Sequence, residues 1–213
     1  MNDVMRFAEK RDQYRRELRA EIADAARAIF VRDGFDGFSI RRLAEQVGCS
    51  PGAIYLHYAS KDALFEALVE ESFARLDGRL RVALDGPAGD PAATLRRALR
   101  IYVDWGLEEP DAYRIAFVLG RPADGPYATH PAFDVARALV RRCLPDAEAG
   151  EQEASAQAVW VAAHGVASLL IQRPTFPWVS RDELIDQVID GAIAGVVSRN
   201  EPSNKGDRHG KSS

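Results

Sequence analysis

The sequence predicts an all-α protein with a small amino-terminal domain followed by a larger helical domain. Apolar residues recur at helical spacing along nearly the whole chain, and no stretch shows the alternation typical of a β-strand. Serine or aspartate followed by proline or by an acidic residue marks several helix starts. With 213 residues, 46% hydrophobic and 28% charged, the chain can bury one small and one medium core.

The first segment, residues 1–16, is polar and rich in both charges, so we expect a flexible extension. Its basic residues are Arg6, Lys10, Arg11, Arg15 and Arg16, and Arg19 follows them. They form either a solvated helix extension or a basic arm that touches DNA phosphates. From Leu18 to Asp33 the apolar spacing predicts a helix, which ends in a turn near Gly34.

The stretch from Ser39 to Lys61 reads as two short helices joined by a tight turn. Gly48 suits a left-handed turn residue, because glycine has no Cβ to clash. Ser50 then offers an N-cap oxygen, and Pro51 fits the first position of a second helix. This is the helix-turn-helix arrangement, in which the second helix enters the major groove of DNA.

Five groups of residues extend the likeness beyond this motif. They are Ala25 to Phe30, Gly34-Phe35, Ser39 to Ala44, Gly48 to Tyr55, and His57-Tyr58 with Lys61. Over roughly residues 17 to 70 the chain resembles the DNA-binding domain of the TetR/AcrR family of bacterial transcription regulators. The resemblance implies a three-helix DNA-binding domain at residues 17–61 and a helical effector-binding and dimerisation domain at residues 62–199.

The resemblance also implies which residues contact double-stranded DNA. These are Ser39, Arg41, Arg42, Ser50, Gly52, Ala53, Tyr55, Leu56, His57, Tyr58 and Lys61. Arg41 matches a position that often reaches a base, and an arginine suits the paired acceptors of guanine. Tyr55, His57 and Lys61 match positions that bind phosphate and set the salt dependence. For His57 a structural role remains an alternative.

Helices are expected to fill the rest of the chain up to a disordered polar tail at residues 200–213. Their ranges are 60–84, 91–108, a helix through 113–117, 132–144, 151–172 and one that opens at Ser180. Loops are expected at 86–89 and 121–131, where proline and glycine gather.

An effector pocket is expected among the central helices, as the family resemblance implies. Its candidate residues are Tyr102, Trp105, Tyr113, Arg114, Phe117, Trp160 and His164. Trp160-x-x-x-His164-Gly165 places an aromatic ring and an imidazole one turn apart and resembles the WHG-type carboxyl-terminal domain of some of these regulators. The alternative is that the aromatic residues form a core and that His164 binds a backbone group.

The last two helices are the expected homodimer interface, because small residues let helices approach closely. The candidate interface residues are Ala158, Ala162, Gly165, Leu169, Ile185, Ile189 and Ile193. The alternative is that these helices are buried entirely inside one chain. That alternative fits one of the two helices better than it fits both.

Charge and cysteine content exclude other classes of site. Residues 1–61 hold eleven basic and nine acidic side chains, whereas residues 62–213 hold seventeen and twenty-three, so the amino-terminal end is the more basic. Cys49 and Cys143 form no C-x-x-C pair, and neither a disulfide, a metal site nor a cofactor is expected. No signal-peptide pattern and no run of membrane-spanning length is recognised, which predicts a cytoplasmic protein without a membrane partner.

The sequence therefore predicts a homodimeric transcriptional regulator that binds a palindromic operator. We expect a repressor that a small-molecule effector releases by changing the tilt of the 60–84 helix. No nucleophile, nucleotide-binding or zinc-protease motif is present, so no catalytic residue is expected. The alternatives are a helical dimeric interaction module or a small helical enzyme with a non-functional DNA-binding corner.

Overall fold

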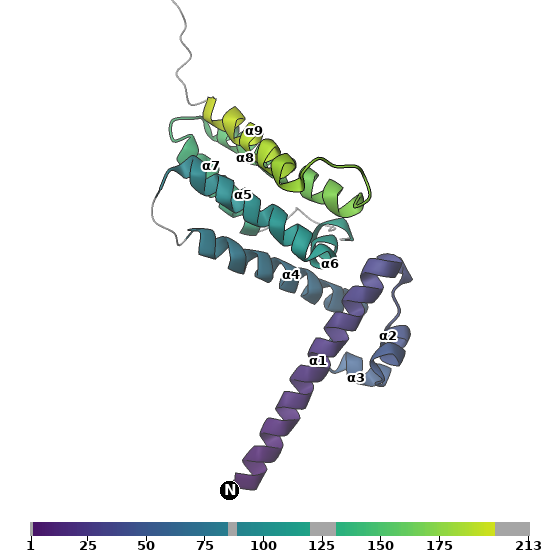
Figure 1. Cartoon of the computed structure of the whole chain (residues 1–213). Helices are drawn as coiled ribbons and strands as arrows, with labels where there is room; N and C mark the ends of the chain where they lie inside the picture. Colours follow the sequence, from purple (N-terminus) through teal and green to yellow (C-terminus); the bar gives the residue numbers. More distant parts are fainter. Residues whose placement is uncertain (1, 85–88, 120–130, 199–213) are drawn as a thin grey trace, which may run out of the picture. The chain divides into compact units, whose positions relative to one another are not determined.

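The computed structural model describes residues 2–84, 89–119 and 131–198, and within these ranges every regular element is a helix (Figure 1). In chain order these elements are α1 (Asn2–Gly37), α2 (Ile40–Val47), α3 (Pro51–Tyr55), α4 (Lys61–Leu84), α5 (Pro91–Glu108), α6 (Pro110–Tyr113), the π-helix η1 (Arg114–Val118), α7 (Pro131–Cys143), α8 (Ala149–Gln172) and α9 (Arg181–Val197). The all-α prediction is thereby confirmed for the described residues.

The chain divides into two compact units. The first comprises Met1–Gly78 and Trp105–Ala128, and the second comprises Arg79–Asp104 and Thr129–Ser213. The chain passes from one unit to the other inside α4 and again inside α5. The first turns of α4 pack into the first unit, since Leu64, Phe65 and Leu68 are buried in its core. The predicted functional boundary after residue 61 stays a prediction.

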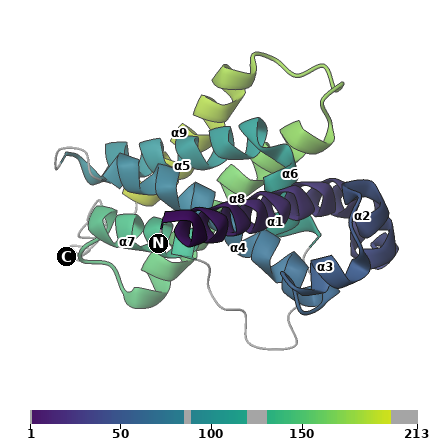
Figure 2. The same cartoon turned by 90° about the horizontal axis from the view of Figure 1, so that it is seen from below.

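Stacked aromatic rings form the centre of the first unit. Phe30 lies parallel to Phe38, with ring centroids 4.0 Å apart, and meets Phe65 edge-on at 5.0 Å. Gly34 lets α1 bend between Phe30 and Phe38, because its φ of 73° lies in the left-handed region that favours glycine. Figure 2 shows α2 and α3 grouped beside the carboxyl-terminal half of α1.

Several helix starts follow the predicted capping chemistry. The Ser50 and Ser60 hydroxyls accept hydrogen bonds from the Ala53 and Ala63 amides, at 3.2 and 3.0 Å. Ahead of α9, Ser180 accepts from the Glu183 amide at 3.4 Å. Ser39 stands at the N-cap position of α2 with extended backbone, but its side chain makes no capping bond.

Two stretches differ from the sequence-based expectation. The first helix begins at Asn2 rather than Leu18, so the described part of the predicted extension is helical and continuous with α1. Beyond Pro110 the chain forms one short α-helix and then a π-helix, in which the Leu119 amide donates to the Arg114 carbonyl at 2.9 Å. Predictions for 86–88, 121–130 and 200–213 lie outside the described residues.

In the second unit α8 packs between α7 and α9. Its buried residues include small ones such as Ala156, Ala163 and Ala167, which allow the neighbouring helices to approach closely. By length and composition alone α8 could cross a membrane, contrary to the expectation from the sequence. One face of α8 is buried against α7 and α9, as in the core helix of a helical domain.

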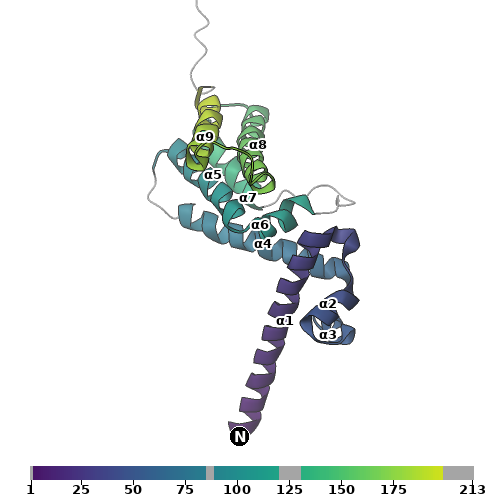
Figure 3. The same ribbon diagram turned by 45° about the vertical axis from the view of Figure 1, so that its right-hand side comes forward.

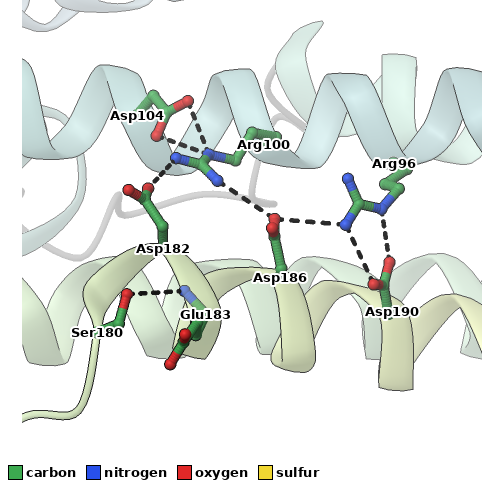
Figure 4. Close-up of polar contacts among 8 residues, drawn as sticks. All are labelled: Arg96, Arg100, Asp104, Ser180, Asp182, Glu183, Asp186 and Asp190. Carbon is green, nitrogen blue, oxygen red and sulfur yellow. Dashed lines mark hydrogen bonds and ion pairs between the residues drawn. The ribbon is translucent and has the colours of Figure 1, made fainter.

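Ion pairs join α5 to α9 on the surface of this unit (Figure 4). Asp182, Asp186 and Asp190 follow one another at intervals of four residues on α9 and face Arg96 and Arg100 of α5. Arg96 donates to both carboxylate oxygens of Asp190, at 2.6 and 3.1 Å, and the carboxylate of Asp186 lies near both arginines. We call these five residues the α5–α9 ladder.

Candidate DNA-binding surface

The helix-turn-helix is held by contacts that local sequence rules anticipate. Gly48 has a φ of 75°, and its amide donates to the Ala44 carbonyl, which ends α2. Ile54 of α3 is fully buried, together with Leu43 and Ala44 of α2. Burying this one aliphatic side chain fixes which face of the five-residue helix α3 remains in solvent.

The solvent face of α3 is small at its start and apolar at its end. Gly52 is exposed, and Ala53 is half-buried. Tyr55 and Leu56 follow with exposed fractions of 53% and 78%. Two adjacent large side chains exposed to water at the end of one helix indicate a surface that a partner covers. Both side chains point away from the core, as predicted for a DNA-facing position.

The two arginines at the start of α2 differ in their freedom. The Arg41 side chain is 86% exposed, and its single weak pair is with Glu45 at 3.4 Å. Arg42 instead pairs with Asp33 at 3.1 Å. The pKa of the Asp33 carboxyl lies below its ordinary value, chiefly because Arg32 donates to it, and Arg42 adds to the effect. Arg41 is therefore the arginine that can reach a partner without breaking a strong pair.

Three further residues predicted to contact DNA are less exposed than Tyr55 and Leu56, and one of them, Tyr58, is buried. Tyr58 is a core residue with 6% exposure, which rules out extensive contact with DNA through its ring. The Lys61 ammonium sits 4.1 Å from the centroid of the Phe35 ring, in a cation–π contact. His57 is half-buried, and its pKa lies below the ordinary value because burial and the charges of Arg15 and Arg19 disfavour the imidazolium.

The predicted pocket residues separate into two groups. In the first unit Trp105 and Tyr113 are fully buried, and Tyr113 packs against Phe117 with centroids 5.1 Å apart. Arg114 follows them in η1 and is half-buried. Trp105 and Tyr113 are thus core residues of this unit, which is the alternative that the sequence left open.

The second group lies in the second unit. The Tyr102 hydroxyl and His164 Nδ1 are 2.9 Å apart, and the Trp160 ring lies 5.6 Å from the imidazole. The His164 pKa is lowered by burial, so the neutral ring is favoured. Phe133, which the sequence did not single out, packs on Trp160 at 5.5 Å. The Trp160 ring and the Tyr102 hydroxyl therefore both lie against a histidine whose neutral form is favoured by burial.

The predicted dimer residues also divide. Ile185, Ile189 and Ile193 are buried within the single chain, at 1%, 1% and 8% exposure, so their assignment to an interface surface is wrong. The helix that carries them, α9, packs against α8. The predicted residues on α8 do reach the surface: Ala158 and Leu169 are exposed, and Ala162 and Gly165 are half-buried. Val161, 63% exposed on the same helix, was missed.

Among the described residues no cluster of histidine, cysteine or acidic side chains is arranged to bind a metal ion. Both cysteines are free thiols. The pKa of Cys143 is raised, chiefly by burial, which disfavours the reactive thiolate.

Comparisons with known proteins match both parts of the chain. Residues 22–68 match the model "Bacterial regulatory proteins, tetR family", and residues 95–192 match "Tetracyclin repressor-like, C-terminal domain". The chain belongs to the TetR family. The second match includes Trp160, His164 and Gly165, the residues of the recognised carboxyl-terminal motif.

One relative and two solved structures illustrate the TetR-family likeness. The repressor AcnR of Corynebacterium diphtheriae is 47% identical over 58 residues, which are 27% of this chain and 30% of that repressor. A TetR-like regulator from Rhodococcus sp. RHA1 superposes with a TM-score of 0.65 at 22% identity, covering 84% of this chain and 95% of that one. A TetR variant from Acinetobacter baumannii AYE in complex with minocycline superposes with a TM-score of 0.59 at 22% identity. The superposition covers 85% of this chain and 97% of that one.

These two kinds of similarity carry different weight. The alignment with AcnR spans about a third of that repressor's length. The two structural neighbours share the TetR fold with this chain, and at their identities they show the fold alone.

Proposed function

We propose that this TetR-family protein is a homodimeric, sequence-specific DNA-binding repressor of the cytoplasm, not an enzyme, and that a small organic effector releases it from DNA. The observation that carries the proposal is the tip of α3, where Tyr55 and Leu56 stand exposed while Ile54 anchors the helix. The relative AcnR is named a transcriptional repressor, which supports the sign of the regulation.

Within the proposed DNA-binding domain, residues 17–61, the side chains have separate roles. Arg41 reads a base edge, because its guanidinium is exposed and weakly paired. Gly52 and Ala53 let the α3 backbone approach the duplex closely, and Tyr55 binds the phosphate backbone. Lys61 contributes positive charge from its place over Phe35, without having to leave that ring.

A second copy of the chain completes the DNA-binding form. A five-residue recognition helix reads too few base pairs to select one site, so two copies are needed about 34 Å apart. We assign dimerisation to the exposed side of α8, where Ala158, Val161, Gly165 and Leu169 recur at helical spacing. Small and aliphatic side chains on one stripe suit a close, dry helix contact.

Effector binding is assigned to residues 62–199. The minocycline complex of a structural neighbour supports a small organic molecule as the class of ligand. Tyr102, Trp160 and His164 supply two aromatic surfaces and a neutral hydrogen-bonding ring. Ile115 and Leu119, which follow Tyr113, pack against the core that also holds Leu43 and Ile54 of the helix-turn-helix. This packing gives a ligand-dependent change in 105–119 a direct way to bias the DNA-binding helices.

The test is selection of bound sequences from a pool of random duplexes with the purified full-length protein. We expect a palindromic site bound by a dimer. Arg41→Ala should abolish selectivity for one position while the protein stays dimeric and folded. Arg32→Ala is the matched control, because its guanidinium is engaged with Asp33. Failure to enrich any sequence at moderate salt would refute the proposal.

A further inference from the structure

The amino-terminal turns of α1 carry a face of arginine and aromatic side chains that no part of the first unit covers within the described residues. Phe7, Arg11, Tyr14 and Arg15 are spaced so that they continue the stripe of Leu18, which packs on the core. Phe7 and Tyr14 are 74% and 63% exposed. Figures 1 and 3 show this half of α1 running on past α2 and α3.

This face begins beside the recognition helix. Arg19 lies with its guanidinium carbon 5.2 Å from the centroid of the Tyr58 ring. Arg15 and Arg19 lie close enough to His57 for their charges to lower its pKa. The arginines at four-residue intervals, Arg11, Arg15 and Arg19, therefore form a row that starts at the turn after α3 and continues along α1.

Asp12, one turn before Arg15, lies at the edge of this row, and the other acidic residues of these turns lie away from it. In the described part of the chain no carboxylate lies within ion-pair distance of Arg11, Arg15 or Arg19. Glu9 and Glu17 fall on the far side of the helix by their spacing, and Glu17 accepts a hydrogen bond from Gln13 at 2.9 Å. The row therefore carries net positive charge, with three arginines beside one aspartate, and has aromatic rings along its other edge.

We infer that this face of α1 is a second DNA-contacting element, which lies along the phosphate backbone next to the major groove that α3 enters. Arg11 and Arg15 pair with phosphates, and Tyr14 and Phe7 cover the adjoining sugars. A duplex is the occupant that the charge favours, because two copies of this face would bring like charges together. A preformed helix needs little further ordering on binding. The inference rests on the proposed function.

The test compares two double variants of the full-length protein, with equal loss of charge. Arg11→Gln/Arg15→Gln removes the row, and Lys10→Gln/Arg16→Gln removes two charges from other sides of the same turns. The probe is the duplex obtained by selection, with about ten base pairs of flanking DNA on each side. We expect the first variant to bind about tenfold more weakly and to lower the slope of log affinity against log salt by about 2 per chain.

The control variant should bind within about twofold of the wild type, and both should keep the wild-type helical circular dichroism signal. Equal losses in the two variants, or no loss in either, would overturn the inference. So would a first variant whose only defect is a weaker dimer in the absence of DNA, since the face would then bind a second copy. Trimming the flanking DNA should abolish the difference between wild type and first variant. A wild type that binds no duplex would refute the proposed function itself, whereas normal binding by the first variant would refute this inference alone.

Discussion

Arg75 of α4 and Glu109, which precedes α6, pair at 3.1 Å within the first unit. Glu71, one turn before Arg75, accepts from Arg75 and also from Arg27 of α1, the latter at 3.1 Å. These four residues form a chain of alternating charge from the helix that precedes the helix-turn-helix to the start of the Pro110–Val118 segment. The pKa of Arg75 is raised, chiefly because it donates to Glu71.

Glu109→Gln should weaken the coupling between effector and DNA rather than DNA binding itself. The substitution removes one charge from the chain, and the partly exposed pair is worth at most about 1 kcal/mol of stability. We expect the DNA affinity of the variant without effector to stay within about threefold of wild type. Adding effector should lower the DNA affinity of the variant less than it lowers that of the wild type. Asp111→Asn, an exposed acidic neighbour, is the control. An unchanged effector response in the Glu109 variant would contradict the prediction.

His164 should make the folded protein less stable in mild acid. Burial lowers its pKa below the ordinary 6.5, so the unfolded chain binds the proton more readily than the folded chain. The free energy of unfolding should therefore be highest above about pH 6.5 and fall as the pH drops below it. Urea unfolding between pH 5 and 7.5 measures this.

His164→Gln should flatten that pH dependence while leaving an acceptor near the Tyr102 hydroxyl. His57 also has a lowered pKa, so His57→Gln is needed as the comparison. The His57→Gln variant should retain the part of the pH dependence of stability that is due to His164. If His164→Gln kept the full wild-type slope, the buried histidine would not be its source.

Gly48→Ala and Gly78→Ala should change stability in opposite directions. A Cβ at either position meets no atom within 4 Å, so packing does not decide the result. Gly48 has a φ of 75°, where alanine costs about 1 kcal/mol or more. Gly78 lies inside α4, where alanine gains about 0.5–1 kcal/mol over glycine. Denaturant midpoints of the two variants test both signs at once, and a stabilised Gly48→Ala would show that the turn is not held left-handed.

Gly165→Leu should break the dimer and spare the protomer. Within one chain a Cβ at Gly165 has open space, as it has at Gly150 near the start of the same helix. Gly165 lies in the stripe we assign to the partner, so a leucine there holds the two copies of α8 apart. Sedimentation equilibrium should show a monomer for Gly165→Leu and a dimer for Gly150→Leu. A dimer of unchanged affinity in the first variant would place the interface elsewhere.

Sequence reasoning succeeded where structure follows from a few neighbouring residues. Gly48, Ser50 and Pro51 specify a turn and a helix start through local backbone rules, and the structure has both. The same rules placed Ser60 ahead of α4. The amino-terminal start of α1 was left open between a solvated helix extension and a basic arm, because charged residues at 1–16 are compatible with a solvated helix and with a coil.

Prediction failed where a helix has two apolar sides. Ile185, Ile189 and Ile193 form a regular stripe, but periodicity does not say whether α8 or a second chain covers it. Tyr58 was assigned to DNA because of its neighbours in sequence, yet its ring packs in the core with Ile54. The π-helix at Arg114–Val118, which packs against α1, was also missed, because no residue pattern used for the sequence-based prediction distinguishes it from an α-helix.

Because the α5–α9 ladder repeats every four residues on both helices, its charges do not define a unique alignment. Sliding α9 by four residues, about 6 Å, would still leave each arginine opposite at least one aspartate, because Asp186 already lies near both Arg96 and Arg100. The electrostatic attraction therefore holds the two helices together but discriminates only weakly between neighbouring registers. The register is set instead by the apolar side of α9, where Ile185, Ile189 and Ile193 are buried. Shortening one of these isoleucines should therefore permit α9 to slip along α5, whereas neutralising a single aspartate should not.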